Sequence, residues 1–254
     1  MPAIPATATI IAFNEASNIT ACIQSVAFFA EVLVIDSGST DDTIALAQAA
    51  GATVISNPWP GFGLQKQFAV DHARHDWVFS IDADERVSAK LKSTIEGLFE
   101  GKPAAGGYFV NRCNHFMGRP LRHGEGYPDW CLRLFDRRSG GWSADVVHEK
   151  VVLEVDPKRL AGDLEHFSEE SLAEYLDKQN RYTTLQAAEM FARGKRAGVA
   201  KLTLSPLTRF VKFYIFRLGF LDGIPGLVHI LVGCFNSFSK YAKLRELQLK
   251  AGKQ

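Results

Sequence analysis

EVLVIDSGSTDDT, residues 31–43, contains the elements that decide the fold: an apolar run, a polar turn and the start of a helix. The run Glu31–Asp36 is apolar and rich in β-branched residues, which predicts a buried strand. The turn can cap a helix over residues 43–50, and Gly51 is suited to end that helix. This order of elements is typical of a βαβ unit in a parallel sheet.

The same alternation extends to both sides of this unit. Strands are predicted at residues 7–13, 52–56 and 77–82, and helices at 15–28 and 64–73. The sequence therefore predicts an α/β fold, with a Rossmann-like, mostly parallel sheet and helices on both faces. Further strands are predicted at 106–113 and 131–137, followed by a helix over 165–191.

Composition and charge narrow the class of protein. The 254 residues are 46% hydrophobic and 22% charged, and the charges nearly cancel, 29 − 28 = +1. This is typical of a globular protein, and it argues against nucleic-acid binding because no excess of cations exists to displace counterions. The four cysteines have no CxxC spacing, and the N-terminus lacks the basic and apolar regions of a secretory signal. We therefore expect reduced thiols and a cytoplasmic protein.

Three predicted strands end in polar clusters, at Asn14-Glu15, Asp36–Ser39 and Asp82–Glu85. Ligands of such sheets bind beyond the carboxyl ends of the strands, so these side chains are expected along one edge. Asp82 and Asp84 could hold one hard cation, which takes its other oxygen ligands from water and phosphates. A solvated acidic turn is the alternative for this pair, and a helix cap is the alternative for Asp36.

Two other nucleotide motifs and one other enzyme class fit less well. Ala-Phe-Asn-Glu follows the first strand where a dinucleotide fold needs Gly-x-Gly-x-x-Gly, and there is no P-loop. An aspartate-nucleophile phosphohydrolase also has Asp-x-Asp after an apolar strand. Here Glu85-Arg86 follow instead of the Thr or Val of that class, and the motif lies too far along the chain.

Six motifs follow one another along the chain: TIIAFNEASNI, VLVIDSGSTDDT, WPGFGLQKQFA, WVFSIDADERVS, RLFDRRSGGW and VVHEKV. In these motifs the chain resembles the inverting family 2 glycosyltransferases with a GT-A fold, over essentially its whole length. More narrowly, it resembles the bacterial branch that contains the lipopolysaccharide core β-1,4-glucosyltransferases. The resemblance implies transfer of glucose from UDP-glucose to the first inner-core heptose. Gln67 departs from the family's Asn, and both amides can form similar hydrogen bonds.

The resemblance also implies roles for individual residues. The donor-binding residues would be Phe13, Asn14, Glu15, Asp36, Ser39, Lys66 and Asp82. The divalent metal, Mg²⁺ or Mn²⁺, would bind at Asp82 and Asp84, with Asp84 as the direct ligand. Glu149 matches the catalytic base, and Asp129 is the alternative.

These residue types suit the chemistry of an inverting transfer. The metal and a lysine stabilise charge on the departing diphosphate, and one carboxylate takes the proton of the acceptor hydroxyl. Cationic side chains could meet an anionic acceptor: Arg112, Arg122, His123, Arg133 and His148. A solvated basic face is the alternative for the arginines, and packing against the sheet is the alternative for His148. Rival functions are transfer to another bacterial glycolipid or polysaccharide, and a non-catalytic nucleotide-sugar-binding module.

The end of the chain has a different composition. We predict a catalytic domain at residues 1–200, with a nucleotide-sugar half (1–105) and an acceptor half (106–200), and a helical segment at 201–254. The apolar run Ile224–Phe235 is about twelve residues long, short of the ~20 that a spanning helix needs. Aromatics interleaved with cations favour a helix lying on an anionic membrane surface, with a packed hairpin or a homodimer interface as alternatives. We therefore expect a peripheral protein on the inner face of the cytoplasmic membrane, with a lipid-anchored oligosaccharide as acceptor.

Overall fold

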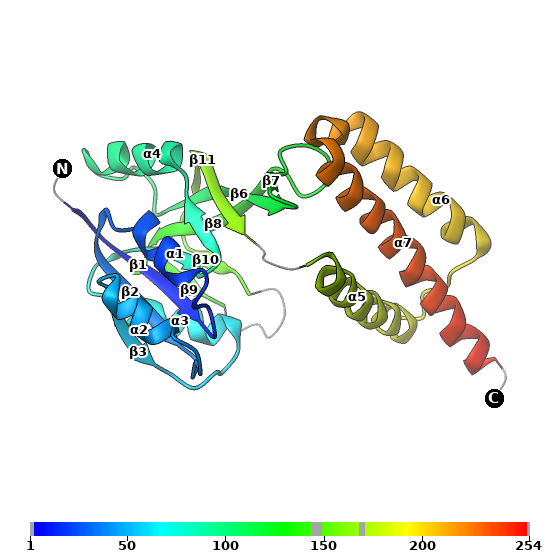
Figure 1. Ribbon diagram of the computed structural model, residues 1–254, viewed down its shortest axis with the longest axis horizontal. Coiled ribbons are helices and arrows are strands. Elements are labelled where there is room, and N and C mark those ends of the chain that lie inside the picture. The colour runs from blue at the N-terminus through cyan, green and yellow to red at the C-terminus, as the bar shows by residue number, and fades with distance from the viewer. Residues whose placement is uncertain (1–2, 144–148, 168–170, 253–254) are drawn as a thin grey trace. The chain divides into compact units, whose positions relative to one another are not determined.

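The computed structural model describes residues 3–143, 149–167 and 171–252. The chain forms two compact units, of which unit 1 comprises residues 1–113 and 128–167 and unit 2 comprises residues 114–127 and 168–254 (Figure 1).

The first half of unit 1 is a parallel βα layer. Strands β1 (Ile4–Ala12), β2 (Phe29–Asp36), β3 (Thr53–Ser56) and β4 (Trp77–Asp82) pair in the order β3-β2-β1-β4, all parallel. Helices α1 (Ile19–Ser25), α2 (Thr43–Ala49) and α3 (Phe62–His72) connect them. The register places Ala12 beside Asp36 and Ile11 beside Asp82, so the polar strand ends do share one edge.

The second half of the sheet is antiparallel and continues the order as β4-β8-β6-β11-β5. Its elements are β5 (Glu85–Val87), α4 (Ala89–Phe99), β6 (Gly107–Phe116), β7 (Arg119–Pro120), β8 (Asp129–Asp136) and β11 (Lys158–Phe167). Strands β9 (Gly140–Trp142) and β10 (Val151–Leu153) form a separate ribbon. The predicted α/β fold, with a Rossmann-like parallel layer and helices packed on the sheet, is therefore confirmed, and the sheet as a whole is mixed.

The predicted helix over residues 165–191 begins too early. Residues 165–167 are the end of β11, and helix α5 runs over Leu172–Ala192. Buried Leu160 and Leu164 alternate with more exposed residues at the period of a strand, and Ser171 begins the helix with a capping box. Gly162, with φ +106°, lets β11 approach helix α4, because a Cβ atom there would lie 2.4 Å from the backbone nitrogen of Leu91.

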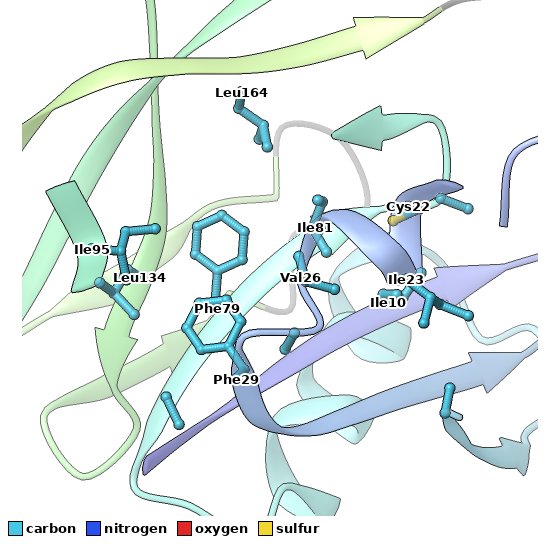
Figure 2. Packing of buried hydrophobic residues seen from close by; sticks show 14 of the residues in the cluster. Ile10, Cys22, Ile23, Val26, Phe29, Phe79, Ile81, Ile95, Leu134 and Leu164 are labelled. Atoms are coloured by element: carbon cyan, nitrogen blue, oxygen red, sulfur yellow. The ribbon is translucent and has the colours of Figure 1, made fainter. Parts of the chain in front are cut away.

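Buried side chains alternate between the two faces of the sheet. Val34 of β2 joins the larger core with α1 and α4, whereas Leu33 and Ile35 pack with α3 on the opposite face. Figure 2 shows the larger core, where Phe29 and Phe79 stack at 5.4 Å between ring centroids. Helices therefore cover both faces and hold the polar strand ends in place.

Unit 2 is built from helices α5, α6 (Val199–Phe210) and α7 (Gly223–Ala251), with a π-helical turn η1 (Val211–Phe216) and a 3₁₀ turn η2 (Gly219–Asp222) between α6 and α7. Helices α6 and α7 lie side by side as a hairpin, and α5 packs on α7 (Figure 1). The predicted boundary between residues 200 and 201 therefore falls within unit 2. Among the described residues, the four cysteines are free thiols.

The length argument against a membrane span is wrong. The helical run Gly219–Ala251 has 33 residues and a best-window mean hydropathy of 1.3, which is long and apolar enough to cross a membrane. The helical run begins before Ile224, at Gly219, and Phe220 and Leu221 add apolar side chains at that end. Only 33% of that window is buried, and the core helix of a soluble protein meets the same criterion of length and composition.

Candidate active site

A cavity of about 970 Å³ opens in unit 1 where β1 and β4 end. Its aromatic lining consists of Phe13, Trp59, Phe62, Trp130 and Trp142. Its charged or titratable lining consists of Glu15, Lys66, Asp82, Asp84, Arg112, Arg133, Glu149, Lys150 and His166. Apolar walls with a few convergent polar groups are typical of a small-molecule site.

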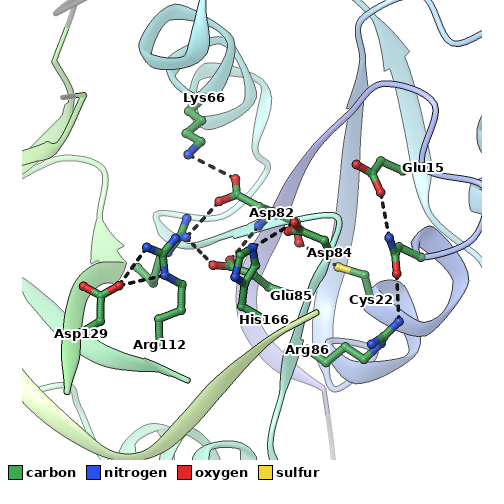
Figure 3. A network of polar contacts seen from close by, with 12 residues as sticks. Glu15, Cys22, Lys66, Asp82, Asp84, Glu85, Arg86, Arg112, Asp129 and His166 are labelled. Carbon is green, nitrogen blue, oxygen red and sulfur yellow. Dashed lines mark hydrogen bonds and ion pairs between the residues drawn. The ribbon is translucent and has the colours of Figure 1, made fainter. Parts of the chain in front are cut away.

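A buried charge network lies on the floor of this cavity. Lys66 Nζ lies 3.2 Å from Asp82 (Figure 3). Arg133 Nη2 lies 3.0 Å from Asp82 and 2.7 Å from Glu85. Burial opposes ionisation of Asp82, but the charges of Arg133 and Lys66 outweigh it and hold the pKa of this carboxyl well below its usual range. Burial dominates at Glu85 and raises its pKa. Asp82 is thus a fixed anion between two cations.

Asp84 has a different neighbour. Nε2 of His166, from β11, lies 3.0 Å from Asp84 Oδ2, and both side chains line the cavity (Figure 3). Burial by itself lowers the pKa of His166, but the hydrogen bond and charge of Asp84 outweigh it and raise the pKa above its ordinary value. Lys66 and Arg133 thus pair with Asp82, whereas His166 pairs with Asp84, so the two carboxylates lie in different electrostatic surroundings.

The donor set around Asp84 fits a divalent cation only in part. Among the described residues, no three His, Cys, Asp or Glu side chains gather closely enough to hold a metal by themselves. Asp84 and His166 would supply two ligands. A cation that keeps water and phosphate oxygens in its remaining positions suits this arrangement, and Mg²⁺ behaves in this way.

The two candidate bases lie in different surroundings. Glu149 lines the cavity, with its carboxylate 3.6 Å from Lys66 Nζ. Asp129, at the start of β8, accepts hydrogen bonds from Nε and Nη2 of Arg112, at 3.0 and 2.8 Å, and its side chain is absent from the cavity wall. Of the two carboxylates, Glu149 is therefore the one that faces the cavity, and the identity of the base stays a prediction.

The predicted donor loop is tied together by its own polar groups. Asp36 is fully buried, and its carboxylate accepts hydrogen bonds from the backbone N–H groups of Gly38 and Ser39, at 2.8 and 2.9 Å. Asn14, with φ +55°, accepts from the N–H of Thr40 at 2.8 Å. These residues brace the loop, while Phe13 and Glu15 line the cavity itself. A role for Asp36 and Ser39 toward uracil or ribose stays a prediction.

The predicted acceptor residues divide between the two units. Arg112 and Arg133 line the cavity in unit 1, whereas Arg122 and His123 belong to unit 2. Arg133 is 4% exposed and bonds Asp82 and Glu85, which makes it a residue that positions Asp82. His148 lies outside the described residues.

Comparison with known proteins gives the family. The sequence model described as Glycosyl transferase family 2 matches residues 7–149, more than half of the chain. The chain belongs to glycosyl transferase family 2. It is a glycosyltransferase, and the matched residues contain the parallel half of the sheet, Lys66, Asp82, Asp84 and Glu149.

Several relatives of this family 2 glycosyltransferase match over most of their length. The lipopolysaccharide core biosynthesis glycosyltransferase LpsC of Rhizobium meliloti (strain 1021) is 34% identical, covering 96% of this chain and 93% of LpsC. An uncharacterized glycosyltransferase of Rickettsia typhi is 32% identical, covering 95% and 87%. A solved glucosyl-3-phosphoglycerate synthase of Mycobacterium tuberculosis, bound to Mn²⁺ and UDP, aligns at 28% identity over 44% of each chain, with a TM-score of 0.36. That score is too low to support a conclusion about this chain.

Sequence reasoning missed two features of the site. His166 was assigned to a helix, although Leu160, Leu164 and His166 share the period of one strand face, which could have placed it beside Asp84. Glu85 was noted only as part of a polar strand end. Its partner Arg133 is distant in sequence, so no local signal could have paired them.

Proposed function

We propose that this glycosyltransferase transfers a hexose, glucose from UDP-glucose, to a heptose of the lipopolysaccharide inner core with inversion. The observation that supports the proposal most directly is the placement of Lys66 between two carboxylates of the cavity, 3.2 Å from Asp82 and 3.6 Å from Glu149. The ammonium group of Lys66 then lies between Asp82, at the proposed donor site, and Glu149, the proposed base. The printed name of the LpsC relative supports the lipopolysaccharide core as acceptor.

The donor would bind against the strand ends. Phe13 and Ser37 line the end of the cavity next to the loop that Asn14 and Asp36 brace, which suits a uridine. Asp84 and His166 would hold a divalent cation, Mg²⁺ or Mn²⁺, that neutralises charge on the diphosphate of UDP. Lys66, buried and held by Asp82, donates hydrogen bonds to the same leaving group without having to be reordered.

Glu149 accepts the proton of the acceptor hydroxyl. As the acceptor hydroxyl attacks the anomeric carbon, its proton passes to the Glu149 carboxylate, and the bond from that carbon to the diphosphate oxygen breaks on the opposite face. A single displacement of this kind converts an α-linked donor into a β-glycoside. A retaining hydrolase would need two carboxylates about 5 Å apart across the sugar.

The acceptor would be anchored in a membrane. Arg112 on the cavity wall, and Arg122 and His123 of unit 2, are suited to phosphates or acidic sugars of an anionic oligosaccharide. We place the enzyme at the inner face of the cytoplasmic membrane as a peripheral protein, bound to an anionic leaflet through unit 2. A homodimer through the same helices is the alternative.

A donor panel tests the function. Purified enzyme is incubated with heptosylated lipid A-core and UDP-glucose, UDP-galactose or UDP-N-acetylglucosamine, each with Mg²⁺, with Mn²⁺ or with chelator. We expect transfer from UDP-glucose only, loss of transfer with chelator, and a β-anomeric product by NMR. An α-anomeric product would contradict the inverting mechanism. Transfer only to acceptors without heptose would contradict heptose as the acceptor sugar.

A further inference from the structure

The connection between α6 and α7 exposes apolar side chains. We call Ile215–Ile224 the hairpin tip. Phe216 is 78% exposed and Ile224 is 71% exposed. The tip also exposes Ile215, Leu218, Phe220 and Leu221. Single exposed apolar residues are ordinary, but this many in ten consecutive residues mark a binding surface.

The charge around the hairpin tip is one-sided. Residues 190–245 contain ten Lys and Arg and one acidic residue, Asp222. Asp222 is 3% exposed and accepts a hydrogen bond of 2.8 Å from the backbone N–H of His123, whose Nδ1 lies 2.8 Å from the same carboxylate. Glu125, on the same loop, is paired with Arg209. The acidic groups nearest the tip therefore have cationic or N–H partners, and the exposed charge is positive.

The hairpin tip is held in shape by the loop at residues 119–127. Arg119 donates a hydrogen bond of 3.3 Å to the carbonyl of Leu221, and Arg217 donates to the carbonyl of Tyr127. Gly219 allows close packing, since a Cβ atom there would lie 2.3 Å from Ile230. These contacts also place two guanidinium groups beside the apolar residues. The tip is thus a preformed apolar surface with cations at its edge.

We propose that the hairpin tip inserts into the boundary between headgroups and acyl chains of an anionic phospholipid leaflet. The inference rests on the proposed function in that a lipid-anchored acceptor requires the enzyme to reach the bilayer. Phe216 and Ile224 enter the acyl region, and Lys212, Arg217 and Arg119 contact lipid phosphates. Exposed apolar residues edged by cations match a lipid surface of opposite charge.

Insertion from one side fits the structure better than a span by α7. Helix α7 packs on both α5 and α6, and it makes polar contacts along its length. Asn236 donates to Gln179 at 2.8 Å, and Lys243 donates to Thr183 at 2.8 Å. A helix that faces lipid on all sides would leave such groups without partners in the hydrocarbon. These polar contacts hold α7 within unit 2, and we assign the membrane contact to the hairpin tip.

Vesicle flotation of the full chain tests the proposal. Vesicles of phosphatidylethanolamine and phosphatidylglycerol should retain the enzyme, whereas phosphatidylcholine vesicles should retain much less. Phe216→Ser with Ile224→Ser should weaken binding tenfold or more. Leu185→Ser with Leu249→Ser, at exposed positions of α5 and α7 outside the tip, should leave binding unchanged. Phe216→Trp should preserve binding, and Lys212→Gln should weaken binding to the anionic vesicles about fivefold.

Two outcomes would overturn this proposal. One is unchanged binding by the tip variant with a normal thermal melt. The other is a dimer by light scattering that the tip variant dissociates while vesicle binding persists, which would assign the tip to a second copy. Transfer to a soluble, delipidated core oligosaccharide separates this proposal from the proposed function. The tip variant should retain that transfer and lose transfer to acceptor embedded in vesicles. Absence of transfer to every acceptor, with vesicle binding intact, would refute only the function.

Discussion

Unit 1 and unit 2 distribute charge and apolar surface in opposite ways. Unit 1 buries Lys66, Arg133 and Glu85 around a cavity, where each ionic group has a partner of opposite sign. Unit 2 exposes large apolar side chains at the hairpin tip, and the exposed charges next to that tip belong to Lys and Arg. Buried charges are costly to desolvate, and exposed apolar groups are costly in water. Each cost would be offset by the ligand proposed for that unit, which is the donor diphosphate for unit 1 and the bilayer for unit 2.

The largest effect should come from Asp84, the cavity carboxylate that pairs with His166. Asp84→Ala should lower kcat/KM by about 10⁴-fold, because metal-assisted charge stabilisation is worth several kcal/mol. His166→Gln should lower kcat/KM less than Asp84→Ala does. The rate of this variant should approach the parent rate at high Mn²⁺ concentration. The measurement is initial-rate transfer from UDP-glucose across a metal titration. If the folded Asp84→Ala enzyme has near-normal turnover, Asp84 is not a metal ligand in the reaction.

The next effect concerns the base. Glu149→Gln should lower kcat by about 10³-fold and change donor binding little, because only the proton acceptor is lost. Asp129→Asn should lower kcat much less, since Asp129 pairs with Arg112 outside the cavity wall. Donor affinity is measured by calorimetry with UDP, and kcat by product formation. If Asp129→Asn has the larger effect on kcat, the two roles are exchanged.

Replacement of Arg133 should show how much the buried charge network contributes to the free energy of unfolding of unit 1. Arg133→Met leaves buried Glu85 without its cationic partner and Asp82 with Lys66 alone, and should lower the free energy of unfolding by about 3 to 5 kcal/mol. Urea unfolding followed by circular dichroism measures it. Arg138→Met is the control, because that guanidinium is 65% exposed, and its unfolding curve should superimpose on the parent's. Equal effects of the two variants would contradict the importance of burial.

The parallel half of unit 1 could be predicted from local sequence patterns, whereas side-chain pairs between distant segments could not. Apolar strands such as Glu31–Asp36 and Trp77–Asp82, each followed by polar turn residues, allowed prediction of the parallel half and its polar edge. The pairing of Arg133 with Glu85 depends on the position of β8 in the sheet, which local patterns do not contain. His166 was misplaced because Glu165 and the residues after β11 suit a helix equally well.

The helices of unit 2 were predicted from the sequence, and their contact with a membrane stays a prediction. The break at Leu218, with φ +56°, has no sequence signal such as Gly or Asn at that position. The packing of α5 on α7 depends on contacts such as that of Lys243 with Asn180, more than sixty residues apart. Such long-range pairs fix the unit boundary.

In unit 2, the ammonium group of Lys243 donates hydrogen bonds to uncharged oxygen atoms. Lys243 Nζ lies 2.8 Å from the Asn180 carbonyl and 2.8 Å from the hydroxyls of Thr183 and Thr184. Lys243→Met should lower the free energy of unfolding of unit 2 by about 1 to 2 kcal/mol, because these bonds join α7 to α5. Hydrogen exchange of α5 and α7 measures it, with Lys240→Met as the control. Faster exchange in α1–α4 instead would show that the two units unfold together.

The smallest effect should appear as a pH dependence confined to unit 1. Hydrogen bonds from Thr43, and a further one from the N–H of Ala16, hold the pKa of Asp41 below its ordinary value of 3.8. A carboxyl with a lower pKa in the folded state contributes stability above pH 3.8, and loses it as the pH falls through the folded-state pKa. Asp41→Asn should therefore lower the Tm slightly at pH 7, and the difference should shrink as the pH falls below 3.8. Asp42→Asn is the matched control, because the Asp42 side chain makes no capping hydrogen bond. A Tm difference for Asp41→Asn that persists at low pH would show that the amide distorts the loop, and that the charge of Asp41 is not what braces it.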